Sequence, residues 1–255
     1  RVSFKTTSFR TNGILTCMST DRFYFRQLLS GRDFAADNKL AEQMANFVYL
    51  IGDRETGDAV AVDPAYGVAD LLDVLANDEM RLSGVLATHY HPDHVGGSMM
   101  GHSIEGIREL LELQGVKIHV QATEAQLIKK VTDVSDTDLI IHSPGDRIMV
   151  GEIPIDLIHT PGHTPGSQCF LVEGTLVAGD TLFLEGCGRT DLPGSDPSAM
   201  FHSLHHTLSK VPDDTVLFPG HRYSFHSSAT MGMTRELNYV FRPSSEQQWL
   251  TMFSQ

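Results

Sequence analysis

Short apolar runs alternate with polar turns along the chain from residue 46 onward. The runs NFVYLIGD (46–53) and DAVAVDP (58–64) are rich in β-branched and aromatic residues and are joined by a polar turn, which predicts a hairpin. Residues 67–78 carry apolar positions at helical spacing, whereas residues 82–89 form another short apolar strand. Helical spacing also predicts a second helix over residues 103–115.

The alternation continues through the second half of the chain, and one or two helices are expected in its tail. Further strands are predicted over residues 116–120, 147–160, 167–174, 175–183 and 215–221. Thr123 and Gln126 match a capping box, while Asp196 and Pro197 mark the start of a helix over 196–210. Because strands come first in each half, we expect two sheets packed face to face with helices outside, rather than a doubly wound parallel sheet.

The segment ahead of these elements, residues 1–44, is mixed and polar. We expect it to be an N-terminal extension, followed by one domain over residues 45–255. At 255 residues, with 41% hydrophobic and 20% charged positions, the chain has the length and composition of a globular protein with a well-buried core. No run approaches the roughly 18 to 20 apolar residues of a membrane span.

The charge and the cysteines restrict the partners and the compartment. A formal charge of −13 argues against a nucleic-acid surface, but a bound metal would still allow an acidic substrate. Cys17, Cys169 and Cys187 are far apart and form no CxxC pair, which favours a reducing compartment. No basic-then-apolar signal stands at the N-terminus, so we expect a cytoplasmic protein.

Histidines and aspartates gather where predicted strands end. His89, His91, Asp93 and His94 lie within six residues in ATHYHPDHVGG, directly after an apolar strand. His163, Asp180 and His221 each follow another predicted strand, beside glycine or proline. A single histidine in such a place is explained equally well as a hydrogen-bonded loop residue. Because strand ends meet at one edge of a sheet, the seven residues together indicate a metal site.

The residue types restrict the metal. Imidazole and carboxylate groups suit zinc, iron or manganese, and the lack of cysteine argues against a closed structural zinc site. Seven ligands are more than one ion takes when it keeps a place for water, so two divalent ions with a bridging carboxylate are expected, with zinc as the first choice. A hydroxide between them is plausible at neutral pH because metals lower the pKa of water to about 7.

The motifs THYHPDHVGG, TPGHTPGS, VAGD and PGH, in this order, resemble the metallo-β-lactamase superfamily over roughly residues 45 to 225. This resemblance implies an α+β fold, an αββα sandwich of two mixed sheets with the metals at the sheet edge. It also implies a division of the ligands: His89, His91 and His163 on the first metal, Asp93, His94 and His221 on the second, and Asp180 between them.

The loop GCGRTDLPGSDP (186–197) resembles the glyoxalase II-like and persulfide dioxygenase branch. Several true β-lactamases carry cysteine at the position of Asp180. We therefore expect lactonase or weak β-lactamase activity less than a glyoxalase II-like or persulfide dioxygenase activity. His91 stands where flavodiiron relatives have glutamate, which argues against oxygen reduction of that type. A non-catalytic metal-binding module is disfavoured because the ligand set is complete.

Two activities remain open within that branch. In a glyoxalase II-like thioesterase, with Asp93 and Asp180 as the catalytic carboxylates, a metal-bridging hydroxide attacks a thioester or related acyl carbonyl. In a persulfide dioxygenase acting on a glutathione persulfide, one Fe(II) is held by His89, His163 and Asp180. Only 34 residues follow His221, fewer than the C-terminal domain of glyoxalase II needs. The dioxygenase branch commonly has alanine at Pro92, and a helical insertion at 98–115 is also unusual there. We expect the hydrolase first.

Other residues are assigned to the substrate or to the surface. By resemblance, Arg189 and Tyr223 bind a substrate carboxylate and amide, although an ion pair and simple packing explain them equally well. Met99, Met100 and His102 border the substrate entrance, and Cys187 is structural. The helical residues His202, His205 and His206 are read as a solvated face. The expected partner is a small acyl or thiol-derived molecule, with no nucleic acid, no membrane and a possible homodimer.

Overall fold

The computed structural model describes residues 22–253, and most of its strands belong to two six-stranded sheets. The first sheet runs in the order β1 (Phe23–Leu29), β2 (Phe47–Asp53), β3 (Asp58–Val62), β4 (Arg81–Leu86), β7 (Lys117–Gln121) and β8 (Leu139–His142). The pairs β1–β2 and β2–β3 are antiparallel and the remaining pairs are parallel. The hairpin predicted from residues 46–64 is the β2–β3 pair.

The second sheet is mainly antiparallel. Its order is β14 (Ala229–Thr230), β13 (Val216–Pro219), β12 (Thr175–Gly179), β11 (Gln168–Val172), β10 (Ile153–His159) and β9 (Arg147–Val150). Only β12 and β13 pair in parallel within it. A small separate hairpin consists of β5 (Gly97–Met99) and β6 (His102–Ile104).

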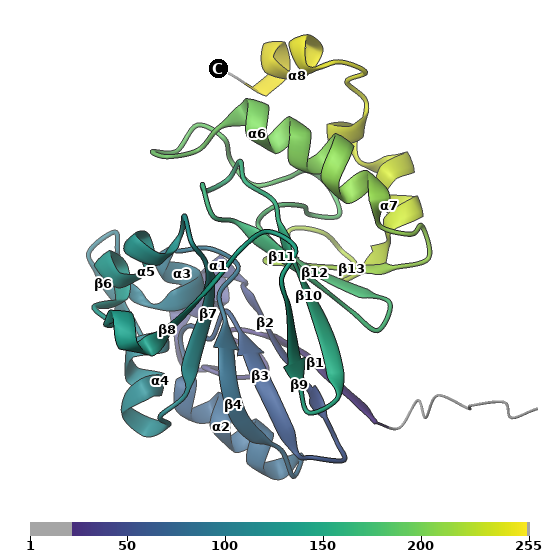
Figure 1. Ribbon diagram of the computed structural model, residues 1–255. Helices are drawn as coiled ribbons and strands as arrows, with labels where there is room; N and C mark the ends of the chain where they lie inside the picture. Colours follow the sequence, from purple (N-terminus) through teal and green to yellow (C-terminus); the bar gives the residue numbers. More distant parts are fainter. Residues whose placement is uncertain (1–21, 254–255) are drawn as a thin grey trace, which may run out of the picture.

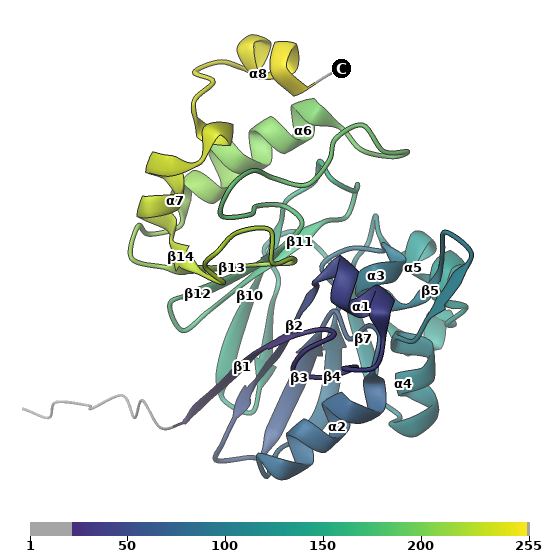
Figure 2. The same ribbon diagram turned by 180° about the vertical axis from the view of Figure 1, so that it is seen from behind.

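Helices cover the outer faces of both sheets (Figures 1 and 2). The α-helices are α1 (Lys39–Met44), α2 (Val68–Asn77), α3 (Pro92–Val95), α4 (Ile107–Leu113), α5 (Ala125–Thr132), α6 (Pro197–His202), α7 (Met231–Leu237) and α8 (Glu246–Phe253). Short turns of other helix types are η1 (Asp136–Asp138), η2 (Ser203–Thr207), η3 (Leu208–Lys210) and η4 (Tyr239–Phe241). In Figure 1 the green and yellow helices α6, α7 and α8 lie over the second sheet, and α2 and α4 lie against the first.

The two-residue period of the strands creates the layers. In β2, Tyr49 and Ile51 pack between the two sheets, while the alternate residues Val48 and Leu50 pack toward the outer layer that includes α2. Phe170 and Val177 contribute the matching inner face of the second sheet. The αββα sandwich of two mixed sheets expected from the sequence is therefore confirmed.

The segment assigned to an N-terminal extension contributes to the folded domain. Strand β1 pairs with β2 over seven residues, from Phe23 opposite Asp53 to Leu29 opposite Phe47. Helix α1 follows it, with Asn38 accepting hydrogen bonds from two amides at its start. Residues 1–21, and with them Cys17, lie outside the described residues.

Two local predictions were wrong. The helix expected over 103–115 is preceded by a strand, because β6 takes residues 102–104 and α4 begins only at Ile107. The capping box at Thr123 does not form: Glu124 is the N-cap residue of α5, and the Thr123 hydroxyl donates instead to the carbonyl of Pro165 at 3.1 Å. The start of α6 is as predicted, since Asp196 accepts hydrogen bonds from the amides of Ser198 and Ala199.

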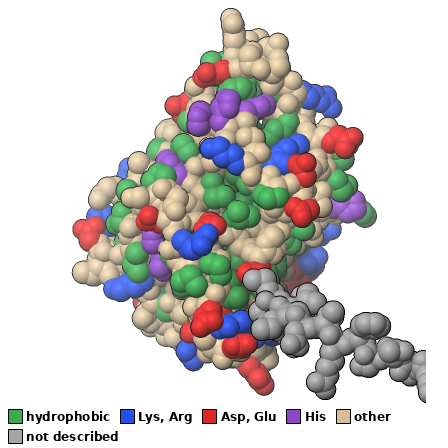
Figure 3. Space-filling view, turned by 45° about the vertical axis from the view of Figure 1, so that its right-hand side comes forward, with side chains coloured by type: hydrophobic (Ala, Val, Ile, Leu, Met, Phe, Trp, Pro, Cys, Tyr) green, Lys and Arg blue, Asp and Glu red, His purple; other side chains and the backbone are tan. Residues whose placement is uncertain are grey.

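The outer surface is mixed in charge on the face shown in Figure 3. Lysine and arginine side chains (blue) are interspersed there with aspartate and glutamate (red). Among residues 22–253, no helix is both long and apolar enough to cross a membrane.

Candidate metal centre

The seven predicted ligands meet at one edge of the sandwich because each follows the end of a strand or begins a short helix there. His89 follows β4, and Asp93 and His94 lie on α3, which begins with Pro92 at its first position. That helix ends at Gly96, whose φ of +88° favours glycine and whose position directly against Gly106 leaves no room for a side chain. His163, Asp180 and His221 follow β10, β12 and β13 of the second sheet.

Three histidines form a first cluster: His89, His91 and His163. His91 Nδ1 lies 3.1 Å from His89 Nε2 and 3.0 Å from His163 Nε2. Two ligands held 2.0 to 2.1 Å from one tetrahedral ion are about 3.4 Å apart. The three nitrogens are therefore spaced as ligands of one cation would be.

The second cluster consists of Asp93, His94 and His221. The two Nε2 atoms of His94 and His221 lie 3.2 Å apart, and Asp93 Oδ2 lies 3.4 Å from His221 Nε2. All three side chains are buried. Asn46, also buried, donates from Nδ2 to Asp93 Oδ2 at 3.2 Å and so holds this carboxylate in place.

Asp180 lies between the two clusters. Its Oδ1 atom is 3.3 Å from His94 Nε2 and 3.5 Å from His221 Nε2, while its Oδ2 atom is 3.7 Å from His163 Nε2. Oδ1 is buried and has no hydrogen-bond partner among the described residues. A buried carboxylate oxygen without a partner is costly, and a cation held by the second cluster would satisfy it.

The ring nitrogen that faces away from the clusters is occupied in four ligand histidines. These contacts run from His89 Nδ1 to Thr88 Oγ1 (2.9 Å), His94 Nδ1 to Asp63 Oδ2 (2.9 Å), His163 Nδ1 to the Arg189 carbonyl (2.8 Å) and His221 Nδ1 to the Met44 carbonyl (2.9 Å). The Thr88 hydroxyl donates to Asp63 Oδ2 at 2.5 Å, so it can only accept from His89. A proton on Nδ1 leaves the Nε2 lone pair free for a metal, which is the arrangement that metal sites use.

Asp63 is a site residue that the sequence reasoning missed. It follows β3, adopts a left-handed φ of +54°, and accepts from the Thr88 amide at 2.7 Å as well as from His94 and the Thr88 hydroxyl. The sequence did contain an indication of this site residue, because Asp63 ends the run DAVAVD in the same way that Asp180 ends TLVAGD. Because the Asp63 carboxylate already accepts three hydrogen bonds, it positions ligands rather than binding metal itself.

Glu124 is a second residue that was missed. It is buried and accepts hydrogen bonds from the Tyr90 amide at 2.8 Å, the Thr164 hydroxyl at 2.8 Å and the Gly166 amide at 2.7 Å. Tyr90 belongs to the loop of the HxHxDH motif, and Thr164 and Gly166 belong to the loop that carries His163. Glu124 therefore joins the ligand loops of the two sheets.

The electrostatics of the second cluster favour a cation. Burial alone would raise the pKa of Asp180, but the neighbouring His221 and His94 hold it well below its usual range. Burial lowers the pKa of His221, yet Asp180 and Asp93 raise it to about 9. In the first cluster, burial and neighbouring histidines lower the pKa of His91 to about 4. The two carboxylates thus concentrate negative charge where a divalent ion would bind, and the donor set fits such an ion.

A cavity of about 580 Å³ opens onto both clusters. Its walls are largely apolar and include Met44, Met99, Met100, Phe183, Leu192 and Tyr239. His102, which was expected at this entrance, lines a different cavity beside Tyr66. Cys187 also lines the metal cavity, and burial raises the pKa of its thiol to about 12, so it stays protonated.

The two predicted substrate-binding residues both reach this cavity. The Tyr223 ring stacks flat on His221, with centroids 4.7 Å apart and planes 5° apart, and 57% of the residue is exposed. The Arg189 guanidinium pairs with Asp191 through Nε at 2.8 Å and Nη2 at 2.7 Å. The alternative explanation for Arg189, a structural ion pair, is therefore present in the structure.

The helical histidines lie apart from both clusters. His202 and His206 are exposed, with ring centroids 5.0 Å apart. His205 is half-buried, stacks on Phe201 at 4.3 Å and contacts the Val240 carbonyl through Nε2 at 3.1 Å. Two of the three thus form a solvated face, and the third packs against the C-terminal segment.

Comparison with known proteins gives one family and several relatives. The family described as the metallo-beta-lactamase superfamily matches residues 42–221. The chain is 32% identical to the mitochondrial persulfide dioxygenase ETHE1 of Homo sapiens, covering 84% of this chain and 80% of that protein. It is 30% identical to the probable polyketide biosynthesis zinc-dependent hydrolase BaeB of Bacillus velezensis (79% and 84%), and 31% identical to the probable hydroxyacylglutathione hydrolase glo2 of Schizosaccharomyces pombe (75% and 71%).

A solved structure agrees with the fold. The crystal structure of ETHE1 from Myxococcus xanthus superposes with a TM-score of 0.73 at 25% identity, covering 91% of this chain and 90% of that one. Relatives named as hydrolases and relatives named as dioxygenases are thus similar to this chain at nearly the same level of identity.

Proposed function

Because the chain belongs to the metallo-beta-lactamase superfamily, we propose that it is a metal-dependent hydrolase of thioesters or related acyl compounds. The superfamily match supports a metal-dependent enzyme, and the choice of hydrolysis rests on one observation. Asp180 lies between two ligand clusters, with a buried, unpartnered oxygen toward the second cluster. Such an arrangement suits two divalent ions, and we propose zinc in both positions.

The metals, when bound, would supply Lewis acidity toward a carbonyl oxygen and toward water. The protein's own residues supply the remaining functions. Asp180 and Asp93, both kept ionised by the neighbouring histidines, would hold the ions and accept hydrogen bonds that orient an attacking water. Asp63 and Thr88 hold two ligand histidines in the required tautomer, so the site is organised before substrate arrives.

Substrate placement follows from the cavity. Tyr223, which lies flat over His221 and is exposed, would offer its hydroxyl to a substrate amide. Arg189 gives Nε and Nη2 to Asp191, which leaves Nη1 as a donor for a carboxylate at the rim. The apolar walls would exclude water from the acyl group and favour a small organic substrate over a polymer.

A persulfide dioxygenase is the second candidate. It is favoured by the 32% identity to the human enzyme and by the TM-score of 0.73 to the Myxococcus xanthus structure. In that function His89, His163 and Asp180 would hold one iron, and His221 would not be a ligand.

The two candidates are separated by one variant and two assays. We expect stoichiometric zinc and turnover of an acyl thioester in the purified protein. His221→Asn removes a ligand of the second cluster only and should abolish thioester hydrolysis, while the exposed His102→Asn is the matched control. One iron per chain, with oxygen uptake on glutathione persulfide that survives His221→Asn, would favour the dioxygenase instead.

A further inference from the structure

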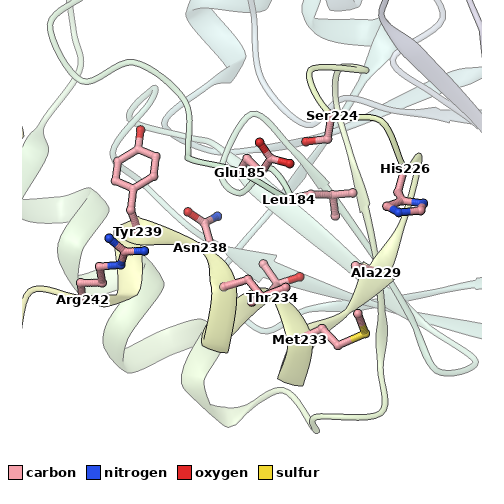
Figure 4. A pocket seen from close by; sticks show the side chains of 11 residues that line it. Leu184, Glu185, Ser224, His226, Ala229, Met233, Thr234, Asn238, Tyr239 and Arg242 are labelled. Atoms are coloured by element: carbon pink, nitrogen blue, oxygen red, sulfur yellow. The ribbon is translucent and has the colours of Figure 1, made fainter.

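A second cavity, of about 610 Å³, lies beside the metal cavity. It is bounded by α7, η4 and the segments around residues 184–185 and 224–229. Figure 4 shows Leu184 facing Met233 and Ala229, with His226 at one end of the hollow and Tyr239 and Arg242 at the other. The metal centre contributes no ligand to this space.

The second cavity adjoins the cavity at the metal clusters. Glu185 and Tyr239 line both cavities, so the two hollows share a wall and an edge. Tyr239 Oη lies against Gly186, where an added Cβ would stand 3.2 Å away, and 43% of Tyr239 is exposed. Asn238 fixes this wall, because its side chain bonds to the Gly186 amide at 2.8 Å and to the carbonyls of Phe183 and Gly186 at 3.0 Å.

Part of the wall and rim of the second cavity is apolar and exposed, next to polar lining residues such as Glu185, Thr234 and Arg242. Leu237 is 67% exposed and Met233 is 54% exposed at the end and on the face of α7. Exposed apolar side chains that line a hollow beside a reaction site commonly mark a binding surface for an apolar group.

We propose that the substrate carries an extended apolar acyl chain, whose carbonyl lies at the metal centre and whose remainder passes over Tyr239 into the second cavity. This inference rests on the proposed thioesterase function and names its substrate class. The acyl chain is favoured as occupant because the two cavities share Tyr239 and because Leu184, Ala229, Met233 and Leu237 give one part of the second cavity an apolar lining. Tyr239 and Leu237 thereby become residues that determine chain-length specificity.

The test is a chain-length series. We would measure kcat/KM for N-acetylcysteamine thioesters with acyl chains of increasing length, beginning with acetyl. Each methylene that enters the second cavity should raise kcat/KM about fourfold, from about 0.8 kcal/mol per buried methylene. Leu237→Asp places a charge on the cavity wall at an exposed position and should remove that rise without changing turnover of the acetyl thioester.

Leu113→Asp is the matched control, because Leu113 is 54% exposed at the end of α4 and lines neither cavity. It should keep the wild-type chain-length profile. A flat profile in the wild-type enzyme, or a profile that Leu237→Asp leaves unchanged, would overturn the inference while leaving the thioesterase proposal intact.

A binding measurement keeps the inference testable if no thioester is hydrolysed. Non-hydrolysable thioethers of short and long chain length would be titrated calorimetrically into the wild-type protein and into Leu237→Asp. Affinity that rises with chain length only in the wild type supports an apolar chain site, even though the proposed reaction would have failed. Equal affinities across the series would refute the chain site independently of any catalytic result.

Discussion

Replacing Asp63 by asparagine tests whether the buried carboxylate controls the metal site through histidine tautomers. Asparagine has nearly the same shape and tolerates the left-handed φ of +54° at this position. The Asp63 Oδ1 atom accepts from the Thr88 amide at 2.7 Å, so an asparagine would keep its oxygen there. Its NH2 group would then face His94 Nδ1, where the carboxylate now accepts at 2.9 Å.

The reversed side chain is no better, because it would direct the NH2 group at the Thr88 amide and leave two buried donors facing each other. In the favoured orientation, His94 must accept at Nδ1 and carry its proton on Nε2, the atom that points into the second cluster. The loss of such supporting contacts lowers metal affinity or activity by about 10- to 100-fold. That range corresponds to about 1.4 to 2.8 kcal/mol.

The assay is metal content after dialysis against buffered zinc, with thioester turnover measured on the same samples. Asp63→Asn should lose metal from the second cluster first and lose turnover in proportion. Asp58→Asn, at the far end of β3 where Asp58 pairs with Arg81 at 2.8 Å, is the matched control. Wild-type zinc affinity and turnover in Asp63→Asn would refute the tautomer argument.

Three further predictions concern the same site. Asp180→Asn should remove most activity while leaving the fold largely intact; wild-type turnover would count strongly against a role between the clusters. Because Asp180 and Asp93 raise the pKa of His221 to about 9 against the effect of burial, a metal must displace a proton there below that pH. Burial lowers the pKa of His91 to about 4, so a metal displaces no proton from His91 at neutral pH. Competition titrations should therefore show the zinc affinity of the second cluster rising from pH 6 to 9, and a pH-independent affinity of that cluster would contradict this. Glu124→Ala leaves hydrogen-bond donors of two loops without an acceptor and should lower the free energy of unfolding in urea by about 3 kcal/mol. An unchanged unfolding midpoint would show that these hydrogen bonds do not stabilise the contact between the loops.

The near agreement between hydrolase-like and dioxygenase-like relatives has a physical basis in this site. In both proposed functions His89, His163 and Asp180 would be metal ligands, and these residues follow strand ends that meet at one edge of the sandwich. The residues that would discriminate lie in the second cluster and in the cavity walls. For this reason the decisive measurements are metal stoichiometry and the His221→Asn variant.

The sequence by itself determined most strands of the two sheets, several of the helices and the candidate ligands, but not β1, β5, β6, β8 or β14. A two-residue apolar period, turn residues and the dense HxHxDH motif are local features, and each can be read within about ten residues. Predictions from local sequence patterns were wrong where a contact with a distant segment determined the structure instead. The Thr123 hydroxyl bonds to Pro165 instead of capping α5, and residues assigned to an extension form β1 because β2 offers a free edge.

Only the tertiary structure decided how the ligands are distributed and supported. His94 and His221 are 127 residues apart in sequence, yet their Nε2 atoms lie 3.2 Å apart. The position of Asp180 between the clusters, the hold of Asp63 on His94, and the wall that Tyr239 shares between two cavities depend on how the two sheets pack. Local sequence patterns do not encode such distances, because they arise from the packing of segments that meet only when the sandwich closes.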